Sequence, residues 1–298
     1  MRLIAGVVTY WPNLELLRRL VQVLAATTDG VIIFANSPLE EREYKRLKRL
    51  SGKGNIEIFQ SSKNVGLGFA YNYILKRAQA MGVYGAFLFD QDSQLCPETL
   101  HQLTAAACQL SSKGHRVAVV GPRPIGPRLQ SAEFKSVRLF ARPQSSSPAR
   151  IMATDFVISS GSLVILSAFE TVGPFRDDFF IDGLDIEWCF RAWKKGFSCW
   201  IVLDAAMEHR LGRGTIIVPV FGISIPIQPP SRLYTYVRNQ VHMLSMAHVP
   251  LRWKLKIIPY ISLQAVVYAL SSRSRRASLV AIGRGVREGL RRMRRQTA

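Results

Sequence analysis

The first half of the chain alternates short apolar segments with segments of helical character. Four apolar segments have the length and flanks of buried strands: residues 3–10, 31–34, 56–59 and 86–89. The segments between them favour helices: residues 12–24, 39–50 and 64–81. Strands that alternate with helices predict an α/β fold, with a mainly parallel sheet flanked by helices. Later apolar segments add expected strands: residues 117–120, 156–165 with a break at Gly161, and 200–203.

Two aspartates follow the fourth apolar segment directly. Asp90 and Asp92 flank Gln91 and precede Ser93, at the expected carboxyl end of a buried strand. Open α/β sheets bind ligands at this edge. Two carboxylates there form a hard oxygen site that suits Mg²⁺ or Mn²⁺ shared with the phosphates of a substrate. The alternative is a solvated turn at the end of a strand.

A second acidic cluster lies in an aromatic setting. Asp182, Asp185 and Glu187 occur within six residues, between Phe179-Phe180 and Trp188. An acid that starts a helix is often only a cap, and we expect a helix from Asp185 with a buried face of Ile186, Cys189, Phe190 and Trp193. Three acids among large apolar side chains fit better with a site in which one carboxylate is a general base.

His209 follows the last expected strand and a short turn. It can complete a metal site with Asp92 or hold a phosphate, although a single histidine in a loop often has no such role. The four cysteines show no short metal-binding spacing, so we expect reduced thiols in a cytosolic protein. The first residues lead straight into a strand, without the pattern of a secretory signal.

Positive charge is concentrated near the C-terminus. The chain carries 40 Lys and Arg against 20 Asp and Glu, a formal net charge of +20. Residues 251–298 contain twelve Lys or Arg and one acid, Glu288, which leaves a net charge of +11. The longest apolar stretch, 257–270, is too short to span a bilayer, so we expect contact with an anionic membrane surface. The alternative is an ordinary helical subdomain with a basic tail.

The remaining segments complete the expected organisation. Residues 142–150 are polar and read as a loop, and residues 213–230 read as a hairpin or docking loop. Helices are expected from Arg232 onward, with breaks at Pro250 and near Ser271. The sequence therefore predicts a catalytic domain over 1–230 and a helical basic region over 231–298.

These motifs, taken in order, resemble family 2 glycosyltransferases of the GT-A fold, and among them the bacterial dTDP-rhamnosyltransferase-like group. The matching segments run nearly from end to end: residues 8–10, 36–37, 64–72, 90–93, 160–162, 180–191, 209–212, 232–234 and 238–239. Each is weak alone, but their order and spacing are specific. The Asp-Gln-Asp-Ser form is the part most suggestive of a dTDP-rhamnose donor.

The resemblance implies roles for individual residues. The implied nucleotide-binding residues are Thr9, Tyr10, Asn36, Asn64, Gly66, Asp90 and Gln91. Asp92 would bind Mg²⁺ or Mn²⁺, with Asp90 and His209 as further ligands. Asp185 would be the catalytic base, with Asp182 and Glu187 as secondary candidates, and Ser160 and Gly161 would lie beside the acceptor. The family often has Glu-Asp where this chain has Leu184-Asp185, which puts one contact to the acceptor in doubt.

The sequence thus predicts a metal-dependent, inverting glycosyltransferase. It would transfer rhamnosyl from dTDP-rhamnose to a lipid-linked bacterial surface glycan, at the inner face of the plasma membrane. Three alternatives stay open: the same fold with a UDP- or GDP-sugar donor, a basic nucleic-acid-binding protein, and an inactive scaffold. No nucleic-acid-binding module is recognisable, and the oligomeric state is not predicted.

Overall fold

The computed structural model describes residues 1–50, 55–125, 150–208, 215–218, 223–272 and 274–297. It divides into two compact units. Unit 1 comprises Met1–Phe180 and Trp188–His209, and unit 2 comprises Ile181–Glu187 and Arg210–Ala298. The sequence predicted a boundary after residue 230, whereas the compact units divide before the hairpin that precedes it. The division into a catalytic domain over 1–230 and a helical region over 231–298 stays a prediction.

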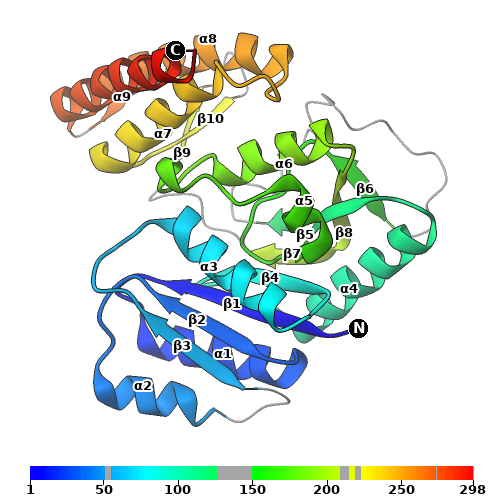
Figure 1. Cartoon of the computed structure of the whole chain (residues 1–298). Coiled ribbons are helices and arrows are strands. Elements are labelled where there is room, and N and C mark those ends of the chain that lie inside the picture. Colours follow the sequence, from blue (N-terminus) through cyan, green and yellow to red (C-terminus); the bar gives the residue numbers. More distant parts are fainter. Residues whose placement is uncertain (51–54, 126–149, 209–214, 219–222, 273, 298) are drawn as a thin grey trace. The chain divides into compact units, whose positions relative to one another are not determined.

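Unit 1 is built on a mixed, mainly parallel sheet (Figure 1). Its strands are β1 (Leu3–Thr9), β2 (Val31–Ala35), β3 (Ile56–Gln60), β4 (Gly85–Asp90), β5 (Val117–Ile125), β6 (Ile151–Thr154), β7 (Ser162–Ile165) and β8 (Ser198–Glu208). In the described part of the chain their order is β3-β2-β1-β4-β7-β5-β8-β6. Strands β1 to β4 pair in parallel, as do β5 and β8, whereas β7 is antiparallel to both of its neighbours and β6 is antiparallel to β8.

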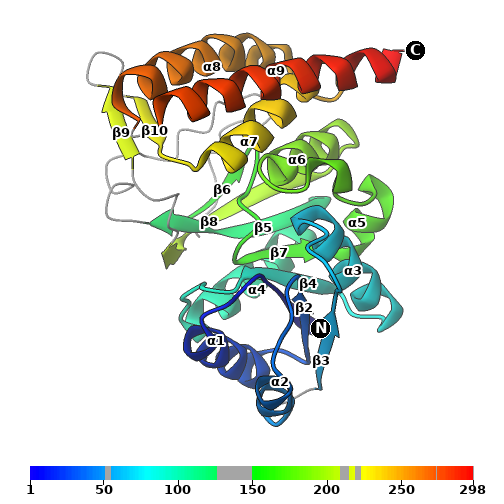
Figure 2. The same ribbon diagram turned by 90° about the vertical axis from the view of Figure 1, so that its left-hand side faces the viewer.

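Helices cover both faces of this sheet. They are α1 (Leu14–Thr27), α2 (Glu41–Lys48), α3 (Leu67–Ala80), α4 (Pro97–Ser112) and α5 (Leu166–Val172), with a short 3₁₀ turn, η1 (Asp177–Phe179). Helix α6 (Leu184–Lys194) begins in unit 2 and ends in unit 1. Helices α1 and α4 contact each other on one face, and α3 and α5 contact each other on the opposite face (Figure 2). The predicted α/β sheet is confirmed. Strands β1 and β2 are buried along their whole length, as expected for strands covered on both faces.

The structure differs from the sequence prediction at three places. In the expected strand region 156–165 the predicted break at Gly161 is present (φ +81°), but residues 156–161 are not strand and only Ser162–Ile165 enters the sheet. Strand β6 was not predicted; it is short and only partly buried at its start, so its pattern is weak. In α6, Ile186 and Trp193 are only partly buried. The buried positions instead include Leu184, Glu187 and Trp188.

The described part of unit 2 from residue 215 onward contains a hairpin and three helices. The hairpin pairs β9 (Thr215–Val218) with β10 (Ile223–Pro226) in antiparallel fashion, which is one of the two readings that the sequence left open. The helices α7 (Pro230–Met243), α8 (Leu251–Ser271) and α9 (Arg275–Thr297) confirm the breaks near Pro250 and Ser271. The expected loop at 142–150 falls outside the described residues except for Arg150. No helix in the described ranges has the length and apolar character needed to cross a bilayer.

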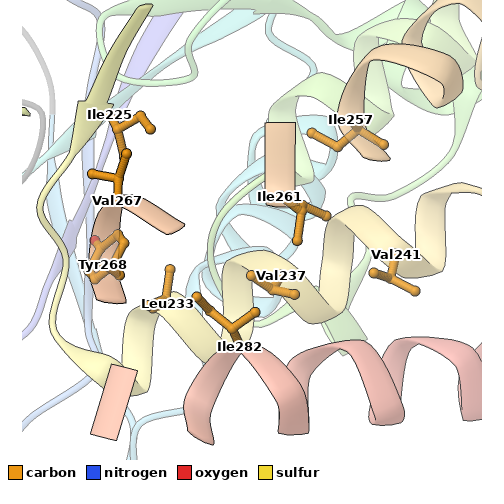
Figure 3. Close-up of a cluster of buried hydrophobic side chains, with 9 residues drawn as sticks. All are labelled: Ile225, Leu233, Val237, Val241, Ile257, Ile261, Val267, Tyr268 and Ile282. Atoms are coloured by element: carbon orange, nitrogen blue, oxygen red, sulfur yellow. The ribbon is translucent and has the colours of Figure 1, made fainter. Parts of the chain in front are cut away.

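The core of unit 2 is a cluster of apolar side chains from β10, α7, α8 and α9 (Figure 3). Its buried members are Ile225, Leu233, Val237, Val241, Ile257, Ile261, Val267, Tyr268 and Ile282. The Tyr268 hydroxyl donates to the Pro226 carbonyl at 2.9 Å and accepts from the Gln228 N–H at 2.7 Å. This aromatic side chain therefore buries its ring while its polar end fixes the exit of the hairpin.

Within unit 1, the buried Asn72 of α3 binds the segment after α5 to this helix. Its amide donates to the Phe175 carbonyl and its Oδ1 accepts from the Phe175 N–H, both at 2.8 Å, and the amide also bonds Asp177.

Asn72→Ala leaves these groups unsatisfied and should lower the free energy of unfolding by about 1–3 kcal/mol in urea denaturation. The matched control is Asn55→Ala at an exposed position, which should change it by less than about 0.5 kcal/mol. Equal effects of the two substitutions would contradict this role.

Candidate functional site

The carboxyl ends of β1, β2 and β4 meet at one edge of the sheet in unit 1. Parallel register places Val8 beside Asp90 and Thr9 beside Ala35. Directly after β2, the Asn36 N–H donates to the Thr9 carbonyl at 2.8 Å. Three of the predicted nucleotide-binding residues, Thr9, Asn36 and Asp90, therefore come together at the edge where such sheets bind ligands.

Thr9 carries an orphaned polar atom at this edge. The residue is fully buried, and its Oγ1 has no hydrogen-bond partner among the described residues. A buried hydroxyl without a partner costs free energy unless a ligand or water satisfies it. Its position next to the Asp90 strand end fits a site that is completed by a polar ligand.

Asn36 and Asn64 shape the loop that leads into α3. The Asn36 side chain donates to the Gly66 carbonyl at 3.3 Å and accepts from the Val65 N–H at 3.1 Å. Asn64 Oδ1 accepts from the Gly66 N–H at 2.9 Å. Both asparagines thus hold backbone groups of this loop, a contribution that the sequence did not reveal. Whether they also contact a nucleotide stays a prediction.

Gly66 is the one position in this loop where only glycine fits. Its φ is +85°, and a Cβ placed there would lie 2.6 Å from Phe180 Cδ2 and 2.8 Å from the Phe180 carbonyl oxygen. The neighbouring Leu67 N–H donates to the same carbonyl at 2.6 Å. The backbone of Phe180 is therefore seated against the start of α3, which explains why the sequence has Gly66 here.

Two exposed aromatic residues stand beside this edge. Tyr10 is 51% exposed and Trp11 is 66% exposed, yet both backbones are fixed. The Tyr10 N–H donates to Gln91 Oε1 at 2.6 Å, and the Trp11 N–H donates to Ser37 Oγ at 2.8 Å. Aromatic rings that are carried on a fixed backbone and open to solvent suit stacking on a planar group such as a base. The sequence reading missed Trp11, although an aromatic pair directly after a strand end was visible.

The two aspartates of the first acidic cluster lie on a tight turn. The Ser93 N–H donates to the Asp90 carbonyl at 3.2 Å, so Asp92 is carried on a turn. Asp90 is partly buried and Asp92 is exposed. Ser160 Oγ accepts from the Asp90 N–H at 3.3 Å and shares a hydrogen bond of 2.9 Å with Ser93 Oγ. Ser160 thus braces the turn from which both carboxylates project.

The donor set at this turn fits a hard divalent cation. Mg²⁺ is commonly held by one or two carboxylates, with substrate phosphates and water as the other ligands. Asp90 and Asp92 supply two carboxylates, and the described ranges contain no cluster of three or more metal-binding side chains. His209, the third predicted ligand, lies outside the described residues. The residues present therefore fit a metal that is shared with a diphosphate better than a closed protein site.

In unit 2, the Asp182 loop is held by helix α7. Arg232 Nη2 donates to Asp182 Oδ1 at 2.9 Å, and Arg232 Nε lies 3.1 and 3.2 Å from the two carboxylate oxygens. The buried Asn239 amide donates to the carbonyls of Ile181 and Asp182, both at 2.8 Å. The sequence named these α7 residues only as part of the resemblance; the structure shows that they hold the second acidic cluster in place.

Asp182 has a perturbed environment. Burial raises the pKa of its carboxyl above the ordinary value, while the hydrogen bonds and the charge of Arg232 lower it. The bidentate partner occupies both oxygens of this carboxylate. Asp182 is therefore better suited to positioning the loop than to accepting a proton from a substrate.

Asp185 and Glu187 differ in accessibility. Asp185 lies in the first turn of α6, is partly exposed, and accepts from the Ile186 N–H at 2.9 Å. Glu187 is buried, and its Oε1 lies 2.8 Å from His248 Nε2, in a contact that is close but not aligned as a hydrogen bond. His248 had no role in the sequence reading. Of the three acids, Asp185 and Asp182 are partly exposed residues, whereas Glu187 is buried.

Backbone strain concentrates around these residues. Within the described ranges, the non-glycine residues with positive φ are Trp11 (+46°), Phe180 (+64°) and Asp182 (+65°). Such conformations cost about 1–3 kcal/mol each and persist where the surroundings enforce them. Each of the three lies next to, or within, a segment that the sequence assigned to binding or catalysis.

Comparison with known proteins agrees with the fold and the motifs. No family model matches the chain. The dTDP-rhamnosyl transferase RfbF of Shigella flexneri is 28% identical over 270 residues, which cover 89% of this chain and 85% of that protein. The chain is thus similar to a dTDP-rhamnosyl transferase over most of its length. The predicted glycosyltransferase class and the resemblance are thereby confirmed.

Solved structures support the fold of this GT-A protein. TarS of S. aureus aligns with a TM-score of 0.53 and 16% identity, covering 91% of this chain, which spans 44% of TarS. The mannosyltransferase PcManGT of Pyrobaculum calidifontis, in complex with GDP-Man and Mn²⁺, aligns with a TM-score of 0.55 and 11% identity. That alignment covers 98% of this chain and 87% of PcManGT. Identities this low show the shared fold, and the ligands belong to those proteins.

Substituting Gly66 tests the close approach of Phe180. Gly66→Ala adds a clash with Phe180 to the strain of a positive φ, and should lower the free energy of unfolding by at least about 2 kcal/mol. The matched control is Gly82→Ala, where φ is +63° but the added Cβ meets nothing within 4 Å; we expect a loss of about 1–2 kcal/mol. Urea denaturation of both variants measures the free energy of unfolding. An equal loss in the two variants would show that the contact with Phe180 does not add to the cost of Gly66→Ala.

The pH dependence of stability tests the Asp182–Arg232 pair. Arg232→Gln removes the interactions that lower the pKa of Asp182, so this pKa rises further. A carboxyl with a raised folded pKa stabilises the protein when protonated, and this contribution is lost as the pH rises through that pKa. The deficit in the free energy of unfolding of R232Q relative to wild type should therefore be smallest below pH 3.8, the ordinary pKa, and should widen toward neutral pH.

The control for this measurement is Arg42→Gln, at an exposed position of α2 in unit 1. Its unfolding free energy should differ from wild type by less than about 0.5 kcal/mol at every pH. A deficit of R232Q that stays constant across the pH series would mean that Asp182 does not titrate as described.

Proposed function

We propose that the protein transfers a rhamnosyl group from dTDP-rhamnose to a lipid-linked bacterial surface glycan. The observation that carries the donor assignment is the similarity to dTDP-rhamnosyl transferase RfbF, which extends over 89% of the chain. The strand-end site of unit 1 supports it, because the sheet edge gathers an unpartnered hydroxyl, exposed aromatic rings and two carboxylates. These are the groups that a nucleoside diphosphate requires.

The donor would be held by residues from the ends of β1, β2 and β4. In this proposal Thr9 Oγ1 finds its missing partner in the nucleotide, and the exposed Tyr10 ring packs on the base. Asn36, Asn64 and Gly66 keep the loop before α3 in the shape that admits the nucleotide. Asp90 and Gln91 complete the pocket from the β4 turn.

A divalent cation, Mg²⁺ or Mn²⁺, would be bound by Asp92 together with Asp90 and His209. When bound, it neutralises the negative charge that develops on the diphosphate leaving group. Ser160 supports this function indirectly, because it holds the turn that carries both carboxylates. Exposure of Asp92 lets its carboxylate reach a ligand without any rearrangement of the sheet.

Asp185 would act as the general base. The acceptor hydroxyl oxygen forms a bond to the anomeric carbon of rhamnose as the bond from that carbon to the diphosphate oxygen breaks. The hydroxyl proton passes to the Asp185 carboxylate, and dTDP leaves with the bonding electrons. One displacement inverts the anomeric centre. Asp182 and Glu187 are the secondary candidates; Arg232 pairs with Asp182, and His248 lies beside the buried Glu187.

A lipid-linked acceptor and a place at the inner face of the plasma membrane complete the proposal. They are supported by the charge of residues 251–298, twelve Lys or Arg against one Glu. Anionic lipids attract such segments, and a lipid-linked acceptor is confined to the same surface.

Two substitutions separate donor binding from chemistry. Asp92→Asn should weaken metal-dependent binding of dTDP-rhamnose by about 10-fold or more, because it removes a charged ligand. Asp185→Asn should leave donor binding within about 2-fold of wild type and lower the transfer rate by about 10²–10⁴-fold. Asp204→Asn, a half-exposed carboxylate that pairs with Arg150 on the surface, is the control and should change neither. Calorimetry and a transfer assay measure the two quantities; full activity of folded D92N and D185N would refute the mechanism.

A further inference from the structure

Helix α8 is apolar on two opposite sides. One side belongs to the core of unit 2, through Ile257, Ile261, Val267 and Tyr268 (Figure 3). On the other side, five apolar side chains are 54–69% exposed: Leu251, Leu255, Ile258, Val266 and Leu270. We call these five residues the outer strip. Isolated exposed apolar residues are ordinary, but a helix that is apolar on both sides needs a second apolar environment.

The outer strip is continuous along the helix. With 3.6 residues per turn, positions 251, 255, 258, 262 and 266 follow one face, and position 270 continues it one turn later. Position 262 is an exposed serine, the small polar member of this row. The strip therefore extends over most of the 21 residues of α8. A contiguous apolar surface of this kind marks an interaction site.

Basic residues border the strip near its start. The helical positions of Arg252 and Lys256 place them on one side of it, and that of Lys254 places it on the other. Residues 251–272 contain no Asp or Glu, and α9 adds further exposed arginines, among them Arg275 and Arg276. An apolar face bordered by cations is the pattern of a helix that lies in the interface of an anionic membrane.

We propose that the outer strip of α8 inserts into the surface of an anionic lipid bilayer, with the helix parallel to the membrane plane. The long side chains of Arg252, Lys254 and Lys256 keep their apolar stems beside the strip and their charges at the lipid head groups. The cations could bind the phosphates of a nucleic acid, but five exposed aliphatic side chains would gain nothing from that partner. A second copy of the chain would bring the same cations together, which opposes pairing.

The inference deepens the proposed lipid-linked acceptor by naming the surface that meets the membrane, but it does not depend on the donor or on transfer. Vesicle binding is measured without either substrate. Failure of the donor assignment would leave the vesicle result unchanged, and failure of vesicle binding would leave donor binding unchanged.

A matched pair of variants tests the strip. Ile258 on α8 and Val280 on α9 are both 54% exposed, so I258D and V280D add the same charge at equal exposure. Co-sedimentation of the full chain with vesicles of phosphatidylcholine and phosphatidylglycerol measures the partition coefficient, and circular dichroism verifies folding. I258D should lower partitioning by about 10-fold or more, because a side chain that would enter the bilayer becomes charged. V280D should lower it by no more than about 3-fold, the effect of one added charge on an anionic surface.

Further outcomes separate the possible occupants of the strip. L255D, a second substitution in the strip, should reproduce the loss of I258D, and vesicles of phosphatidylcholine alone should bind the wild type more weakly. Equal partitioning of I258D and V280D, or no binding of wild type to anionic vesicles, would overturn the proposal. So would a concentration-dependent dimer that I258D dissociates, because the strip would then be occupied by a second copy.

Discussion

The parallel pairing of β1 with β2 and β4 is the constraint on which the donor-side site depends. Parallel strands end at the same edge, so the register that pairs Val8 with Asp90 also gathers Thr9 and Asn36 within reach of one ligand. A slip of one residue would turn Asp90 to the other face of the sheet. The strands are buried along their length, which fixes the register, because a slip would also expose the apolar side chains of β1 and β2. The proposed binding residues thus lie at turns, and the buried core fixes their positions.

The second acidic cluster obtains its geometry in a different way. No strand end supports it; instead, side chains from α7 reach the Asp182 loop, which lies about fifty residues earlier in the chain. The Asn239 amide satisfies two backbone carbonyls of a segment with positive φ at Asp182, and Arg232 compensates the buried carboxylate. The strained backbone is therefore stabilised by contacts within unit 2. Asp185, a partly exposed residue, lies at the start of α6 close behind this segment in the chain.

Sequence alone could predict the elements whose signal is local. The strands before Thr9, Asn36 and Asp90 are apolar and bounded by turn residues, so the strand-end site was foreseen. The antiparallel insertion of β7 and the existence of β6 depend on pairing partners distant in the chain, which no local pattern encodes. The tasks of Asn36 and Asn64 as supports of a loop, the burial of Glu187 against His248 and the clamp from Arg232 depend on tertiary contacts. Conversely, the two-sided apolar character of α8 was visible in the sequence, but only the structure shows which side is exposed.

The most direct test of the central claim is calorimetric titration of the protein with dTDP-rhamnose and with UDP-, GDP- and CMP-sugars, in Mg²⁺ and again in EDTA. The account predicts selective binding of dTDP-rhamnose that is lost in EDTA, because Asp90 and Asp92 hold the diphosphate through a divalent cation. Selective binding of another nucleotide sugar would contradict the donor assignment but keep the fold and the site. Absence of binding by any of them would contradict the strand-end site itself.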